Sequence, residues 1–317
     1  MTEQAGRRGG GPDAGATDGR AGYSDEQVAA LYGVLNPWGP SDDFYLDLVM
    51  GAGSVLDVGC GTGALLRRAR EAGHAGRLCG VDPDQASLAV ARRRADVEWV
   101  AGTAATIPWW GEFELAVMTG HAFQVLVADD ELRASLAAIR RSLAGGGRFA
   151  FETRNPLARA WERWNPANAT DVLDPAGRPL RIAHQVESVA GEVVTLTETT
   201  SDPDGAPLRV DRASLRFLGP DRLAAFLAEA GFGVEAQYGD WSRAPLGPSS
   251  PEPARKAEPR RPGPPRRPRP GPPRRGPPVP GPCQPRRPPP PPGDPSGSGP
   301  VATGRDGSVI QSLHEPR

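Results

Sequence analysis

The 317-residue chain has a formal net charge of −1, but its basic and acidic side chains are unevenly distributed. Residues 251–317 hold 13 Lys and Arg against 5 Asp and Glu, whereas the preceding 250 residues hold 24 against 33, and this acidic part argues against a nucleic-acid-binding surface. The three cysteines are far apart, which excludes a CxxC metal pair and a disulfide framework. With no apolar run long enough for a membrane span or a signal peptide, the composition predicts a cytoplasmic protein without a metal site.

The composition changes twice along the chain and divides it into three parts. Residues 1–23 lack apolar periodicity, which predicts a disordered leader. Residues 24–250 contain the apolar runs of a single α/β domain of ordinary size. Residues 251–317 are rich in Pro and Arg, which predicts a disordered, extended tail with PxxP segments of the kind that bind an SH3-like partner.

The globular part begins with two predicted helices and continues as an alternation of strands and helices. The first helix is expected at residues 24–35, with Ser24 and Gln27 forming a capping box, and the second is expected to begin at Ser41. The alternation that follows predicts a Rossmann-like, doubly wound, mostly parallel sheet. Its strands are expected at 54–58, 77–82, 97–102, 113–120 and 148–153, and its helices at 63–73, 84–95 and 129–147.

After Arg154 the pattern changes to alternating stretches separated by turn signals. Residues from about 178 to 218 predict three antiparallel strands, either inserted into the main sheet or laid over it. A helix is then expected at 219–232, with Pro in its first turn and Gly near its end, and one more strand at 233–241.

The sequence DVGCGTG, residues 57–63, lies where the first strand turns into a helix. Glycine permits a tight turn and lets a ligand approach the backbone, and the helix N-terminus adds free N–H groups. Asp82 ends the next strand nineteen residues after Gly63, where a carboxylate meets the two hydroxyls of a ribose. A nicotinamide dinucleotide fits less well, since it prefers GxGxxG and Asp57 would repel its pyrophosphate. A cationic ligand with an amino group and a sulfonium suits this acidic loop.

The motifs VLDVGCGTG and GVDPDQASLAVAR resemble the first two motifs of the class I S-adenosylmethionine-dependent methyltransferases, and the resemblance extends over roughly residues 28–245. Further stretches resemble a bacterial subgroup of small-molecule methyltransferases whose substrates are largely unassigned. The resemblance implies S-adenosyl-L-methionine as cofactor and in-line transfer of its methyl group to a nitrogen, oxygen or carbon nucleophile of a small-molecule acceptor. The alternative is a protein that binds this cofactor without catalysis.

The resemblance also implies roles for individual residues. Asp57 would reach the methionine ammonium, Asp82 would hold the ribose hydroxyls, and Pro83 would lie beside the adenine. Tyr32 would close over the cofactor, and His121 is the best-placed candidate for a general base. The full implied cofactor site is Asp57, Gly59, Cys60, Gly61, Gly63, Asp82, Pro83, Thr103, Ala104, Thr119 and Gly120.

Arg154 completes the implied catalytic set of His121, Tyr32 and Arg154. It follows the fifth strand, whose end faces the acceptor in this fold, and the alternative is an exposed pair with Glu152.

Two positions depart from the family pattern. Thr103 stands where the family usually has an aspartate that accepts from the adenine amino group, and Glu114 replaces another aspartate in the fourth strand. Both changes predict weaker cofactor binding and favour the non-catalytic alternative.

The tail departs further. In the family a β-branched run after SPE forms the last strand, which lies between the fifth and the sixth, but here Pro and Arg follow Glu252. The sequence therefore predicts either a frameshift near Glu252 that removed the final strand or a genuine linker.

Overall fold

The computed structural model describes residues 22–247, residue 250 and residues 254–259. Residues 1–21 of the predicted leader and the part of the predicted tail beyond Pro259 lie outside these residues. The predicted end of the leader at residue 23 is wrong, because Tyr23 is buried and packs with Leu31. A frameshift origin of the tail stays a prediction. No helix in the described part is long and apolar enough to cross a membrane.

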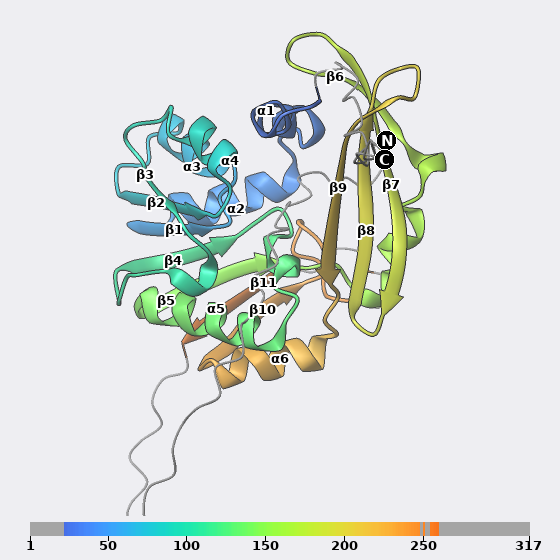
Figure 1. Ribbon diagram of the computed structural model, residues 1–317. Coiled ribbons are helices and arrows are strands. Elements are labelled where there is room, and N and C mark those ends of the chain that lie inside the picture. The colour runs from blue at the N-terminus through green and yellow to red at the C-terminus, as the bar shows by residue number, and fades with distance from the viewer. Residues whose placement is uncertain (1–21, 248–249, 251–253, 260–317) are drawn as a thin grey trace, which may run out of the picture. The chain divides into compact units, whose positions relative to one another are not determined.

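The main sheet has seven strands within the described residues, and five neighbouring strands are parallel (Figure 1). This confirms the predicted Rossmann-like fold. The strands run, in sheet order, through β10 (Phe232–Tyr238), β11 (Ala254–Pro259), β5 (Leu143–Glu152), β4 (Phe113–Met118), β1 (Ser54–Val58), β2 (Arg77–Asp82) and β3 (Glu98–Ala101).

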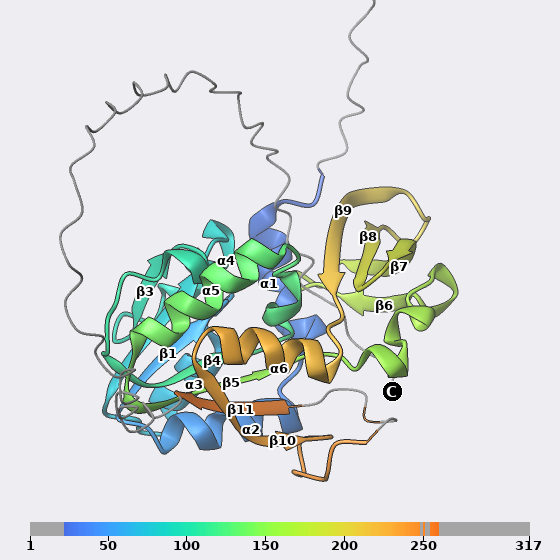
Figure 2. The ribbon, with the colours of Figure 1, turned by 90° about the horizontal axis from the view of Figure 1, so that it is seen from below.

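Helices cover both faces of this sheet because successive strand residues point to opposite sides. Leu56 and Val58 belong to the cluster with α5 and α6, whereas Val55 packs with α2 and α3 on the other face (Figure 2). The helices are α1 (Asp25–Leu35), α2 (Pro40–Met50), α3 (Ala64–Glu71), α4 (Gln85–Ala91), α5 (Asp129–Ser142) and α6 (Pro220–Glu229).

The helix starts follow local capping chemistry. Ser24 and Gln27 form the predicted capping box at α1. The second helix starts earlier than Ser41, because Pro40 occupies the first turn and the Asp42 carboxylate accepts from the backbone N–H of Gly39. Asp84 caps α4 by accepting from two backbone N–H groups.

The antiparallel insertion is a separate sheet with a fourth strand that the sequence did not indicate. It packs on its own clusters, one with Trp164 and Phe217 and one with Tyr23 and Leu31, the latter from α1. Its strands are β6 (Thr170–Leu173), β7 (Pro179–Ala190), β8 (Val193–Ser201) and β9 (Pro207–Arg216). Short 3₁₀ turns connect the elements: η1 (Ala104–Thr106), η2 (Ala122–Val125), η3 (Pro156–Ala158), η4 (Ala160–Arg163) and η5 (Pro166–Asn168).

The expectation that the final strand is missing is wrong. Strand β11 lies between β10 and β5 and pairs antiparallel with both, so the sheet extends past the predicted boundary at residue 250. Ala257 lies opposite Val234 on one side and Phe149 on the other, and its side chain is fully buried. Backbone groups make the ladder, so a segment without β-branched residues can satisfy two strand edges that would otherwise expose N–H and C=O groups.

Removal of β11 is expected to destabilise the domain by about 3 kcal/mol or more, since both neighbouring strands lose their partner. Truncation after Ser250 should therefore melt well below truncation after Pro259, which keeps the strand, in a thermal unfolding measurement. Ala257→Asp in the full chain should be comparably destabilising, because it buries an unpaired charge. Equal melting temperatures for the two truncations would show that β11 contributes no stability.

Candidate functional site

Parallel strands end at the same edge of the main sheet, and most of the predicted site residues lie in the segments that follow these strand ends. Val58 of β1 lies opposite Val81 of β2, and Met118 of β4 lies opposite Phe151 of β5. In Figure 1, β4 and β5 point toward the antiparallel sheet, and the Gln124 side chain in η2 donates to the backbone oxygen of Arg216 at the end of β9 (3.0 Å). The segments leaving this edge are 59–63, 82–84, 119–121 and 152–155.

Asp57 is the most deeply buried carboxylate of the edge, with 1% of the residue exposed. Its Oδ1 has no hydrogen-bond partner among the described residues. Burial raises the pKa of Asp57 to about 8, and the negative charges of Asp82 and Glu152 add to this effect. A buried carboxylate with an unpartnered oxygen is costly by itself, and so this position is suited to a ligand that brings a positive charge.

Asp82 joins the end of β2 to the glycine loop. Its Oδ2 accepts from the backbone N–H of Gly61 (2.7 Å), and its Oδ1 accepts from that of Asp84 (2.8 Å). Burial raises the pKa of Asp82. Each carboxylate oxygen retains a second lone pair, so the hydrogen bonds that fix the side chain leave capacity for two hydroxyl donors. Because Asp84 caps α4, Asp82 is available for the ligand role.

The three glycines of the loop all have positive φ, but their surroundings differ. A Cβ at Gly63 would meet the Trp99 ring at 2.4 Å, and one at Gly59 would meet Ala122 at 2.9 Å, so these two glycines are required by packing. A Cβ at Gly61 would meet no described atom within 4 Å. Gly61 is therefore the glycine whose backbone faces open space.

Cys60 turns its side chain away from that space. It is buried, and a Cβ on Gly80 in β2 would meet its Sγ at 2.7 Å. Burial raises the pKa of the Cys60 thiol, which makes a thiolate unfavourable there. Only the backbone of Cys60 can contribute to a ligand site.

The loop after β4 is held by Glu152. Gly120 and His121 both have positive φ, and the backbone N–H of His121 donates to Glu152 Oε1 (2.9 Å). The hydroxyl of Tyr45 in α2 donates to Glu152 Oε2. These two bonds join α2, β5 and the loop. The sequence analysis assigned no role to Tyr45, so its contact with β5 was missed.

Tyr32 reaches the same loop from α1. A Cβ on Gly120 would meet its hydroxyl oxygen at 3.1 Å. Burial, together with nearby carboxylates, raises the pKa of Tyr32 to about 12. The phenol therefore keeps its proton near neutral pH and can donate a hydrogen bond, but it cannot serve as a base.

Glu152 and Arg154 are both buried, with 2% and 1% of each residue exposed, so an exposed pair is wrong. The Arg154 guanidinium donates to Gln124 Oε1 (3.0 Å) and lies over the Trp164 ring, 5.2 Å from its centroid. Gln124 thus bridges β5 and β9, a role that nothing in its sequence context indicates.

The other predicted residues lie around this edge. Pro83 and Thr103 are exposed, and the backbone N–H of Thr103 donates to Thr106 Oγ1 (2.9 Å). Thr119 is half-buried, and Ala104 packs in the core, so its side chain is not in the site. Glu114 accepts from the backbone N–H of Gly53 (2.7 Å) at the start of β1, the opposite edge of the sheet. Its substitution therefore gives no support to weaker cofactor binding.

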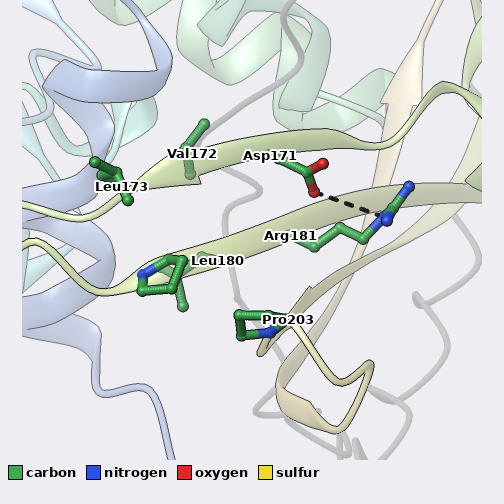
Figure 3. A pocket seen from close by; sticks show the side chains of 7 residues that line it. Asp171, Val172, Leu173, Leu180, Arg181 and Pro203 are labelled. Carbon is green, nitrogen blue, oxygen red and sulfur yellow. Dashed lines mark ion pairs between the residues drawn. The ribbon is translucent and has the colours of Figure 1, made fainter.

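Two further features lie outside this edge. A hollow of about 330 Å³ lies on β6 and β7, where Asp171 and Arg181 form an ion pair at 3.8 Å (Figure 3). None of the residues that line this hollow belongs to the edge of the main sheet that holds Asp57 and Asp82. Within the described residues, no group of three His, Cys, Asp or Glu side chains could hold a metal ion.

Comparison with known proteins agrees with this geometry. Residues 55–147 match the profile of the family described as "Methyltransferase domain". The 2-phytyl-1,4-naphtoquinone methyltransferase of Thermosynechococcus vestitus is 30% identical over 177 residues, which are 51% of this chain and 77% of that protein. The chain belongs to the S-adenosylmethionine-dependent methyltransferases.

Solved structures establish the same fold for this methyltransferase. An S-adenosylmethionine-dependent methyltransferase from Clostridium acetobutylicum superposes with a TM-score of 0.59 at 15% identity, over 73% of this chain and 97% of that one. CalS10 from Micromonospora echinaspora, an amino pentose methyltransferase solved with S-adenosylmethionine bound, gives 0.55 at 24% identity, over 75% and 98%. At these identities the likeness concerns the fold.

The residues at the edge fit S-adenosylmethionine. The unpartnered Oδ1 of Asp57 suits a cationic ligand, and the open space at Gly61 gives that ligand access to the backbone. Asp82 lies at the end of β2 with spare acceptor capacity for ribose hydroxyls.

Gly61→Val is expected to abolish cofactor binding, because its side chain would fill the open space beside the loop. Gly73→Val is a matched control, since Gly73 also has positive φ and open surroundings but follows α3. Calorimetric titration with S-adenosylmethionine should give no heat for the first variant and wild-type affinity for the second. Cofactor affinity within a few-fold of wild type in folded Gly61→Val would exclude this loop as the site.

Affinity for the cationic cofactor is expected to rise with pH up to about 8, because Asp57 must lose its proton. The slope should approach about tenfold per pH unit below that value. Asp57→Asn should flatten the profile, and the ligand's own titration is common to both proteins. The stability of the cofactor-free protein should change in the opposite direction and fall as pH rises. Asp57 binds a proton more tightly when folded, so its contribution to stability is lost as pH rises toward 8. If the ratio of cofactor affinities between wild type and Asp57→Asn does not change with pH, the assignment of Asp57 is contradicted.

Proposed function

We propose that this methyltransferase acts on a small-molecule acceptor held between the loop after β4, the end of β5 and the antiparallel sheet. The observation that carries the proposal is the chain of contacts from Glu152 to His121 and from Arg154 through Gln124 to β9. These contacts join the loop after β4, the end of β5 and β9, which supports an acceptor site among them. By their names, the relative from Thermosynechococcus vestitus acts on a naphthoquinone and CalS10 acts on an amino pentose. Both are small molecules, which supports a small-molecule acceptor.

When bound, S-adenosylmethionine supplies an electrophilic methyl group. The chain's contribution is to bind, orient and exclude water, which accounts for most of the rate in such displacements. We assign cofactor binding to Asp57, Asp82 and the backbone of residues 59–63. The Tyr32 hydroxyl covers the site from α1 as a hydrogen-bond donor.

His121 is the proposed base, since Glu152 fixes its backbone at the end of β4. Its imidazole takes the acceptor's proton only where the nucleophile carries one at the working pH. Arg154 is a positioning residue, because its guanidinium donates to the Gln124 side chain and lies over the Trp164 ring. The cytoplasmic location stays a prediction, as does binding of an SH3-like partner by the part of the tail beyond Pro259, which lies outside the described residues.

A methyl-transfer screen over small amines, phenols, quinols and carboxylic acids tests this function. At least one class should yield S-adenosylhomocysteine and methylated product in equal amounts. With that acceptor, His121→Ala should lower the rate by about 10²–10⁴-fold if the nucleophile is protonated. His74→Gln is the control, because His74 contacts the Ala52 carbonyl at the opposite edge of the sheet. Transfer to protein or nucleic acid but to no small molecule would contradict the proposal.

A further inference from the structure

A further strand, β10, ends at the same edge of the main sheet as the parallel strands. Strand β11 pairs antiparallel with both β10 and β5, so β10 and β5 have the same direction (Figure 2). Tyr238 at the end of β10 and Glu152 at the end of β5 both lie opposite Ala254 of β11. The loop after β10, residues 239–247, therefore leaves the sheet beside the segment that follows β5.

Hydrogen bonds within this loop fix its backbone. The Asp240 carboxylate accepts from the backbone N–H of Ala244 (3.1 Å), and the backbone N–H of Gly239 donates to the backbone oxygen of Ala244 (2.7 Å). A Cβ at Gly239 would meet the backbone oxygen of Pro245 at 2.6 Å, so this tight turn requires glycine. The backbone is thus held on both sides of Trp241, a residue to which the proposed function gives no role.

Trp241 packs against α2 at this edge. Its ring centroid lies 5.9 Å from that of Tyr45 and 5.7 Å from that of Phe44. Tyr45 is 1% exposed, and its hydroxyl donates to Glu152 Oε2. Glu152 Oε1 in turn accepts from the backbone N–H of His121 (2.9 Å). A continuous series of contacts therefore runs from Trp241 to the loop of the proposed base.

We propose that Tyr45 and Trp241 are positioning residues for methyl transfer, which hold the His121 loop in place through the Glu152 carboxylate. His121 has positive φ, a conformation that residues other than glycine rarely adopt, so its loop depends on surrounding contacts to keep its shape. The Tyr45 hydroxyl fixes the Glu152 side chain, and the Trp241 ring keeps Tyr45 from moving away. The inference rests on the proposed role of His121.

Tyr45→Phe tests the first contact of this series in the cofactor-free protein, without any acceptor. The variant keeps the aromatic ring but removes one of the hydrogen bonds that fix Glu152. Hydrogen exchange at the backbone N–H of His121, followed by NMR, should become faster by about tenfold or more. Exchange in β8, which lies in the other sheet, should stay unchanged.

Tyr238→Phe is the matched control for this measurement. Tyr238 belongs to the same aromatic group, with its ring centroid 6.1 Å from that of Phe44, and the variant leaves the hydrogen bond of Tyr45 in place. Exchange at His121 should therefore equal that of the wild type. Unchanged exchange at His121 in Tyr45→Phe, or an equal increase in β8, would overturn the proposal.

Kinetics with an acceptor from the methyl-transfer screen test the consequence for the reaction. Tyr45→Phe and Trp241→Ala should each lower kcat by about tenfold or more and leave the cofactor's Kd within about twofold of wild type. Trp241→Phe should restore most of the rate, because a ring again covers Tyr45. Equal losses in the two Trp241 variants, or a cofactor Kd that rises as much as kcat falls, would overturn the proposal.

The two measurements separate this inference from the proposed function. A screen that finds no small-molecule acceptor contradicts the proposed function, whereas the exchange rate at His121 still decides whether Tyr45 holds the loop. If an acceptor is found and kcat is unchanged in both Tyr45→Phe and Trp241→Ala, the function stands and the positioning role falls.

Discussion

Parallel pairing of β1 with β2 and β4 is the constraint on which the site depends. Because parallel strands end at one edge, Asp57, Asp82 and the loop at His121 meet there although they are far apart in the sequence. Together with the pairing of β4 with β5, this parallel pairing buries the carboxylates of Asp57, Asp82 and Glu152, and hydrogen bonds from the backbone N–H groups of Gly61 and His121 fix two of them. The fold therefore concentrates carboxylates at the edge to which we assign the cofactor.

The sequence was most informative where backbone and side chain follow the same local rule. The glycine loop and Asp82 could be predicted because a tight strand-to-helix turn and a strand-end carboxylate have recognisable patterns. It was less informative about the reason for each glycine. Gly63 is required by the Trp99 ring on β3, a contact that depends on packing and has no signal in the spacing. Side-chain bridges such as that of Gln124 were missed for the same cause.

Other predictions were wrong because tertiary context outweighed composition. Glu152 ends β5 and Arg154 follows it, and composition alone favours exposure of such charged residues. Hydrogen bonds from Tyr45 and His121, and the contact of Arg154 with Gln124, instead allow both to be buried. Glu114 also illustrates this limit, since the family resemblance suggested that it affects cofactor binding, whereas its position in β4 places it at the far edge.

The position of β11 has a consequence for how the polypeptide acquires its structure during synthesis. The last strand of the sheet is inserted between β5 and β10, both of which precede it in the chain. Until Ala257 and its neighbours have left the ribosome, those two strands have no partner on their facing edges. The nascent domain thus passes through a stage with an open slot in its sheet. In that stage, unpaired backbone groups are available to other chains, and completion of the fold waits for a segment rich in residues that rarely form strands.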